Sequence, residues 1–120
     1  MTDVCGVADI GEVISRDGAI NQIEGGIVQA TSWTLKEAAF FSGTRVGMEG
    51  WPDYPILRFS EVPRVRVELI EPEGKPPLGC GEISQGPTAA AIGNAIFNAL
   101  GIRVRDLPIT RDSIITAVNR

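Results

Sequence analysis

Residues 77–101 have the sequence Pro77-Leu-Gly-Cys-Gly-Glu-Ile-Ser-Gln-Gly-Pro-Thr-Ala-Ala-Ala-Ile-Gly-Asn-Ala-Ile-Phe-Asn-Ala-Leu-Gly101, a glycine-rich loop followed by a helix. Gly79 and Gly81 let the backbone come close to a ligand, and Pro87 suits the first turn of a helix. The first N–H groups of a helix have no intrahelical partner, so Glu82 is expected beside a cluster of free donors. One carboxylate in such a loop is typical of an active site.

The composition indicates one ordinary globular domain over residues 1–120, with 43% hydrophobic and 22% charged residues. The net charge of −4, with no histidine, argues against nucleic acid or an anionic membrane surface as a partner. The longest mainly apolar run, near residues 89–100, is too short to span a bilayer. The first residues lack a secretory signal pattern, so we expect a cytoplasmic protein, although a longer parent polypeptide could be exported.

The titratable residues limit the chemistry. Two cysteines, Cys5 and Cys80, are too few for a disulfide framework or a metal site. Because the chain also has no histidine, we do not expect its side chains to bind a transition metal. Nucleophilic catalysis by Ser-His or Cys-His pairs is excluded for the same reason. Acid–base chemistry must fall to a carboxylate, to Tyr54 or to a lysine.

Apolar periodicity predicts a strand over residues 4–10 and a long helix over residues 17–40, with Asp17 as its N-cap. The strand begins almost at the first residue, which fits a piece of a longer polypeptide or a short native N-terminal strand. Gly25 and Gly26 fall inside the long helix, where each costs about 1 kcal/mol relative to Ala. Either the helix starts after Gly26, or the backbone there approaches another group closely.

Further elements are expected along the rest of the chain. They are a short strand over 44–48, a half-buried strand over 64–71, a helix over 87–100 ending at Gly101, an extended segment over 103–109 and a short amphipathic helix over 111–118. The order indicates an α+β or α/β fold, in which a small mixed sheet is covered by one long and one medium helix.

Four motifs occur in a fixed order: Gln22-Ile-Glu-Gly-Gly-Ile-Val-Gln29, Tyr54-Pro-Ile-Leu-Arg-Phe59, Val62-Pro63 and Gly79-Cys-Gly-Glu82. Together they resemble the C-terminal part of the large, molybdopterin-binding subunit of the xanthine dehydrogenase and aldehyde oxidase family, and the match covers nearly the whole chain. Residues 86–97 and 105–109 are similar to the bacterial isoquinoline and nicotinate oxidoreductase branch.

The resemblance implies hydroxylation of an N-heterocycle or an aldehyde at a molybdenum–molybdopterin cofactor, with water supplying the oxygen. Glu82 matches the family's general base, and Gln22 matches a glutamine that contacts the cofactor. Gly25 and Gly26 would then permit close approach. The cofactor-binding positions expected here are Gln22, Gly25, Gly26, Gly81, Gln85 and Gly86. The partners implied are the remaining molybdopterin-binding segments and an iron–sulfur subunit.

The residues alone leave alternatives open for these positions. Glu82 could simply cap the following helix, and Gln22 could be a surface residue followed by a helix–helix contact at the glycines. Gln85, Gly86 and Thr88 could bind an anionic group at the helix start or only cap the helix. A glycine-lined loop raises the pKa of a carboxylate by desolvation, whereas the helix N-terminus lowers it, so the sequence does not fix the result.

The chain differs from the family at Ser15-Arg16 and at Ala30, where other residues are common. The larger difference is its length, because the family's catalytic subunit is several times longer. Most cofactor contacts of the family lie in segments that are missing here. We therefore expect the C-terminal part of a larger cofactor-binding domain, inactive by itself, with Glu82 supplied to a shared site. The main alternative is a non-catalytic assembly module that self-associates or pairs with a partner subunit. A third hypothesis is an unrelated small acid–base enzyme that uses Glu82.

Overall fold

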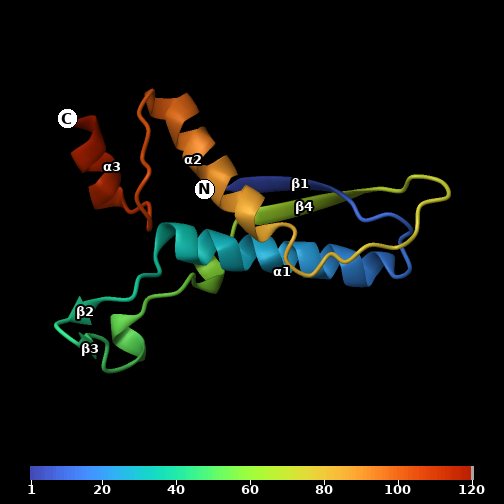
Figure 1. The fold of residues 1–120 in the computed structure, drawn as a ribbon. Helices are drawn as coiled ribbons and strands as arrows, with labels where there is room; N and C mark the ends of the chain where they lie inside the picture. Colours follow the sequence, from blue (N-terminus) through green and yellow to red (C-terminus); the bar gives the residue numbers. More distant parts are fainter. Residues whose placement is uncertain (120) are drawn as a thin grey trace.

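The structure is a computed structural model that describes residues 1–119. Its elements are β1 (Asp3–Asp9), α1 (Arg16–Leu35), β2 (Phe41–Ser42), β3 (Arg45–Val46), β4 (Arg64–Ile70), α2 (Gln85–Leu100) and α3 (Arg111–Val118). The described chain is therefore a mixed α/β structure with small sheets and three helices, as the sequence predicts. Figure 1 shows α1 as the central element, with the strand pair and α2 on one side of it.

β1 and β4 form a parallel pair in the register Asp3↔Arg64 to Asp9↔Ile70. Both strands alternate between exposed and half-buried residues, which confirms the half-buried strand predicted over 64–71; its half-buried residues are Val65, Val67 and Leu69. Gly6 on β1 lies close to α1, because a Cβ added there would be 3.2 Å from Ile27 Cδ1. The strand pair therefore packs one face on α1 and leaves the other open.

α1 supplies most of the buried core. Its apolar residues recur three and four positions apart, so they share one face of the helix; the buried apolar set is Ala19, Ile23, Ile27 and Ala30. The helix runs through Gly25 and Gly26 without a break, so a start after Gly26 is wrong. The burial of this face offsets the low helix propensity of the two glycines.

The predicted ends of α1 differ from the observed ones. Ser15, with extended backbone, occupies the N-cap position, and Asp17 lies in the first turn, where a carboxylate interacts favourably with the helix dipole. The helix ends at Leu35 instead of residue 40. Here the backbone carbonyl of Thr34 accepts a hydrogen bond of 2.6 Å from the N–H of Ile109, so a distant segment replaces the next helical turn.

Residues 36–63 form an arm that projects away from the helices (Figure 1). It contains the short antiparallel β2–β3 pair, so the predicted strand over 44–48 is reduced to Arg45–Val46. At its base, the Leu57 N–H donates to Ser32 Oγ on α1 at 2.8 Å. Two further contacts lie within the arm and close it next to the end of α1: the Tyr54 hydroxyl donates to Glu37 Oε2 at 2.8 Å, and Lys36 pairs with Glu61.

In the C-terminal part, both predicted helices are confirmed, whereas the predicted extended segment differs. Residues 103–109 form no strand, because within residues 1–119 they pair with no other strand; Ile109 is instead buried beside α1. α2 begins at Gln85, two residues before Pro87, and ends at Leu100; the next residue, Gly101, has a φ of 70°, the left-handed conformation expected there. α3 begins after Thr110, whose Oγ1 accepts from the N–H of Ser113 at 3.1 Å.

Among the described residues, no helix combines the length and the apolar character needed to cross a membrane. The cytoplasmic location expected from the sequence stays a prediction.

The Tyr54–Glu37 contact predicts a titration. The hydrogen bond to the Glu37 carboxylate, with desolvation and the negative charge of Glu37, raises the pKa of Tyr54 above its usual value of 10.0. Because the folded-state pKa is raised, this contact stabilises the fold below pH 10 and is lost as the pH rises through the folded value. Tyr54 is the single tyrosine, so ultraviolet absorbance reports it directly. We expect the titration midpoint of Tyr54 to lie above pH 10 in the unmodified chain and to be lower in Glu37→Gln. Equal midpoints in the two proteins would show that the contact does not form.

Candidate functional site

The two elements that carry the predicted site residues meet where the loop before α2 crosses α1. Gln22 lies on the exposed side of α1, and its Nε2 donates to the backbone carbonyl of Gly81 at 2.7 Å. Glu82 follows Gly81 directly. The structure therefore brings together the predicted base and the predicted cofactor-contacting glutamine, which are far apart in the sequence.

The two glycines of α1 have different surroundings. A Cβ added to Gly26 would lie 2.3 Å from Ser84 Oγ, so the absence of a side chain makes room for the loop. Gly25 is exposed, and an added Cβ there would meet nothing within 4 Å among the described residues. The close approach at Gly26 is thus made by Ser84, which matches the contact alternative, whereas Gly25 remains accessible to a group from outside.

The start of α2 holds the other candidates. Gln85 donates from Nε2 to Gln29 Oε1 at 2.9 Å, which ties α2 to α1. Gly86 is exposed. Thr88 is buried, and its hydroxyl donates to the Ser84 carbonyl at 2.6 Å, so this hydroxyl serves the local turn.

Glu82 is exposed at the end of the glycine-rich loop. Its backbone carbonyl accepts a hydrogen bond from the Gln85 N–H at 3.3 Å, but within residues 1–119 its carboxylate accepts none. Ser84, not Glu82, occupies the N-cap position of α2. The structure thus gives no support to the helix-capping alternative, and the carboxylate is free to meet a substrate or another polypeptide.

The candidates form an exposed surface with amide and backbone groups. Gln22 and Gly25 are three residues apart and share a face of α1. Gly81, Glu82 and Gly86 extend this surface across the loop to the start of α2. Within residues 1–119, no group of three or more His, Cys, Asp or Glu side chains is placed to hold a metal ion. The binding groups available are hydrogen-bond donors and acceptors, which suit an organic cofactor.

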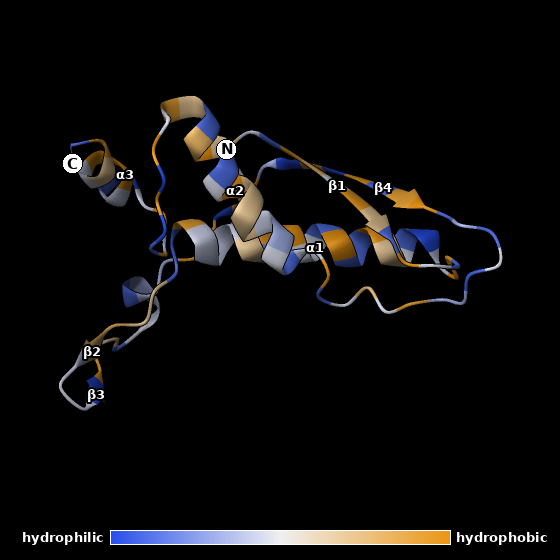
Figure 2. Cartoon of the chain, turned by 45° about the horizontal axis from the view of Figure 1, so that its top comes forward, coloured by the Kyte–Doolittle hydropathy of each residue, from blue (hydrophilic) through white to orange (hydrophobic). Residues whose placement is uncertain are grey.

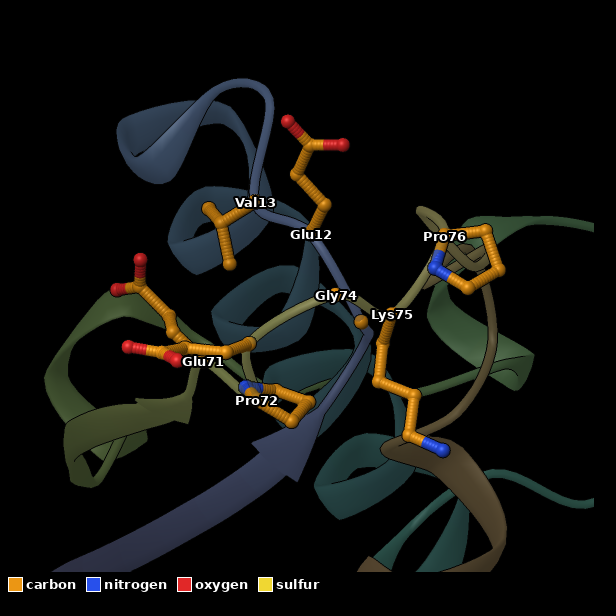
Figure 3. Close-up of a pocket in the computed structure, with 9 residues that line it drawn as sticks. Glu12, Val13, Glu71, Pro72, Gly74, Lys75 and Pro76 are labelled. Atoms are coloured by element: carbon orange, nitrogen blue, oxygen red, sulfur yellow. The ribbon is translucent and has the colours of Figure 1, made fainter.

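A separate pocket of about 750 Å³ lies between the loops that follow β1 and β4 (Figure 3). The sequence analysis did not single it out. Its charged residues are Glu12, Glu71, Glu73 and Lys75. Glu71 is also paired with Arg16. Excess negative charge on exposed side chains disfavours an anionic group, so this pocket is a poor place for a phosphate-bearing cofactor.

Ser84 and Gln29 have roles in the site that were not predicted from the sequence. Ser84 Oγ donates to the Ile23 carbonyl at 3.0 Å, and Gln29 accepts from Gln85. One signal was present: positions 22, 26 and 29 are four and three residues apart, so they lie on one face of a helix. Two glutamines on either side of a glycine there indicate a polar contact face.

The family model described as the molybdopterin cofactor-binding domain matches residues 1–63. The chain belongs to this family, and it is a molybdopterin-binding segment of the xanthine dehydrogenase and aldehyde oxidase type.

Two relatives support the finer resemblance to the bacterial isoquinoline and nicotinate oxidoreductase branch. The chain is 43% identical to the B subunit of nicotinate dehydrogenase from Pseudomonas putida over 92% of its length, and 34% identical to the beta subunit of isoquinoline 1-oxidoreductase from Brevundimonas diminuta over 84%. It covers only 9% and 13% of those proteins. Each relative is therefore several times longer than this chain.

Solved structures give the same fold. Quinoline 2-oxidoreductase from Pseudomonas putida 86 superposes over 99% of this chain with a TM-score of 0.84 and 27% identity, covering 16% of that protein. The aldehyde oxidoreductase from Desulfovibrio desulfuricans superposes over 92% with a TM-score of 0.76 and 28% identity, covering 12%. The fold described above is thus that of one segment of a molybdenum hydroxylase.

The Gln22–Gly81 contact makes a prediction for stability. Gln22→Glu replaces the donating Nε2 with an oxygen that faces the Gly81 carbonyl, so the hydrogen bond is lost. We expect the free energy of unfolding to fall by about 0.5–1.5 kcal/mol, measured by chemical denaturation. Asn21→Asp is the matched control, because it makes the same charge change on the exposed neighbouring residue. Equal losses in both variants would show that charge, and not the hydrogen bond, causes the effect.

Proposed function

We propose that this chain forms one wall of the molybdenum cofactor site of a hydroxylase, as the C-terminal part of a larger cofactor-binding domain, and that Glu82 is its general base. The observation that carries the proposal is the hydrogen bond from Gln22 to Gly81, because it joins two family-matched motifs beside an unpartnered carboxylate. A base must present a free carboxylate to the proton that it takes. The exposed Glu82 meets that requirement.

The cofactor, when bound, supplies the redox centre that accepts two electrons from the substrate carbon, with water as the source of oxygen. This chain would hold it through the exposed groups already described. Gln22 uses its amide nitrogen on Gly81, which leaves its amide oxygen as the acceptor. Gly25, Gly81 and Gly86 offer unobstructed backbone, because an added Cβ would meet nothing within 4 Å among the described residues. Gln85 would border the cofactor, whereas Gly26, which is buried next to Ser84, would support this surface from behind.

The remaining parts of the site would come from other polypeptide segments. The chain covers 9–15% of four curated relatives that match over most of its length, so most cofactor contacts would lie outside it. We infer that it works with the remaining molybdopterin-binding segments and an iron–sulfur subunit, and that it is inactive alone. The nicotinate and isoquinoline enzymes among the relatives favour N-heterocycles as substrates, with aldehydes as the second class.

The test uses the chain co-expressed with the remaining segments of a molybdopterin-binding subunit, such as that of the Pseudomonas putida relative. The assembly should bind molybdenum and oxidise a member of a panel of N-heterocycles and aldehydes. Glu82→Gln should keep the molybdenum content and lower kcat by about 100-fold or more, because the amide does not accept the proton.

Glu73→Gln is the control, since it makes the same change on an exposed glutamate earlier in the same connection between β4 and α2, away from the attached residues 81–85. Turnover that is unaffected by Glu82→Gln would remove Glu82 as the base. Stoichiometric molybdenum and substrate oxidation by the 120-residue chain alone would contradict its incomplete status.

The arm supports a second candidate function, an assembly module. It exposes large apolar side chains, among them Phe41, Trp51 and Phe59, of which Trp51 is 85% exposed and Phe59 fully exposed. Figure 2 shows that the part of the arm that carries β2 and β3 lies away from the three α-helices. Contiguous exposed apolar surface usually marks a protein interface. Such an arm would bind a second copy of the chain or a partner subunit even if the chain had no part in catalysis.

Light scattering tests the assembly module. The unmodified chain should self-associate or bind the co-expressed segment, and Trp51→Ser combined with Phe59→Ser should reduce this association by removing apolar contact area. Ile14→Ser is the control, because Ile14 is also strongly exposed but lies outside the arm. A monomer that binds no co-expressed segment, with or without these changes, would contradict the assembly module.

A further inference from the structure

Ser84 makes an unusual contact between a loop and the middle of a helix. Its hydroxyl donates to the backbone carbonyl of Ile23 at 3.0 Å, although that carbonyl lies inside α1. The contact is possible because Gly26 lies directly beneath the hydroxyl, where a Cβ would come within 2.3 Å of Ser84 Oγ. The serine and the glycine are therefore complementary in shape.

Two other hydrogen bonds lie on either side of this contact. Gln22 holds the Gly81 carbonyl, and Gln85 donates to Gln29. The five residues 81–85 are thus attached to α1 at three points, from Gln22 to Gln29 along one face of the helix. Thr88 adds support from α2, because its hydroxyl donates to the Ser84 carbonyl.

Glu82 lies inside this attached segment but takes no part in it. Its carboxylate accepts no hydrogen bond from residues 1–119, so its position is set by its neighbours in the chain. Gly79 and Gly81 would otherwise give the loop wide backbone freedom, which costs free energy to restrict. The attachments at Gly81 and Ser84 restrict the loop on both sides of Glu82.

We propose that Ser84, seated over Gly26, is a positioning residue that latches the Glu82 loop to α1. This inference rests on the proposed role of Glu82 as a base. A carboxylate that must meet a proton within hydrogen-bond distance benefits from being placed before the substrate binds. The latch acts through the backbone of the loop and touches neither substrate nor cofactor.

The test compares three single variants in the full chain. Ser84→Ala removes the hydroxyl, and Gly26→Ala places a methyl group where the hydroxyl lies. Gly25→Ala is the matched control: it makes the same change one residue earlier in α1, where an added Cβ meets nothing within 4 Å among the described residues. Both glycine variants gain the same helix propensity, so a difference between them reports the contact with Ser84.

Two measurements follow the loop itself. Hydrogen exchange reports the amides of residues 81–85, and thiol labelling reports Cys80, with Cys5→Ser as the background because Cys5 is exposed. We expect Ser84→Ala and Gly26→Ala to raise both the exchange rate of these amides and the labelling rate of Cys80 by about three- to tenfold. This is the factor that corresponds to the loss of one net hydrogen bond. Gly25→Ala should leave both rates unchanged. The midpoint of thermal unfolding, followed by circular dichroism, separates local loosening from loss of the fold.

The outcomes separate the latch from the proposed function. Unchanged loop exchange in Ser84→Ala, or equal effects of Gly25→Ala and Gly26→Ala, would overturn the latch. In the co-expressed enzyme, Ser84→Ala should lower kcat and leave the molybdenum content unchanged. If the loop loosens but neither Ser84→Ala nor Glu82→Gln lowers kcat, the latch exists and the assignment of Glu82 as the base fails. If Glu82→Gln lowers kcat and Ser84→Ala does not, the positioning role fails alone.

Discussion

The rest of the structure depends on the burial of one face of α1. The β1–β4 pair packs on Ile23 and Ile27, α2 crosses the same helix at Gly26, and the C-terminal segment is held by the Thr34 carbonyl. A parallel pair of only two strands has little stability of its own, because such strands are usually buried on both faces. α1 supplies the apolar surface that both strands and α2 need. The site therefore lies on the same helix that holds the fold together.

That arrangement explains how a small segment can carry part of a catalytic site. The side of α1 that turns toward the Glu82 loop is polar, with Gln22 and Gln29 on either side of Gly26, while Ile23 and Ile27 face the core. One helix thus fixes the core and the loop together. The three hydrogen bonds hold the loop and the first residue of α2 on α1, which links the position of the loop to the helix that forms the core.

The accuracy of the sequence-based predictions follows from how local each signal is. The strand 64–70 and the helix ending at Gly101 were predicted well, because alternation and a left-handed glycine act within a few residues. The extended segment expected over 103–109 does not become a strand, since a strand needs a neighbouring strand to pair with and this segment lies beside α1 instead. The predicted end of α1 was too late for the same reason, because a distant backbone N–H takes a carbonyl of its last turn.

The sequence by itself determined the three α-helices, the strands β1 and β4, the glycine-rich loop and the one carboxylate in it, and its motifs indicated the family that the comparisons confirmed. It did not distinguish Gly25 from Gly26 or assign a task to Ser84. Only the tertiary structure decided these, because the deciding hydrogen bonds join residues 56–61 positions apart. Periodicity and propensity describe a residue's near neighbours. The direction in which one helix meets a distant loop is set by packing over the whole chain.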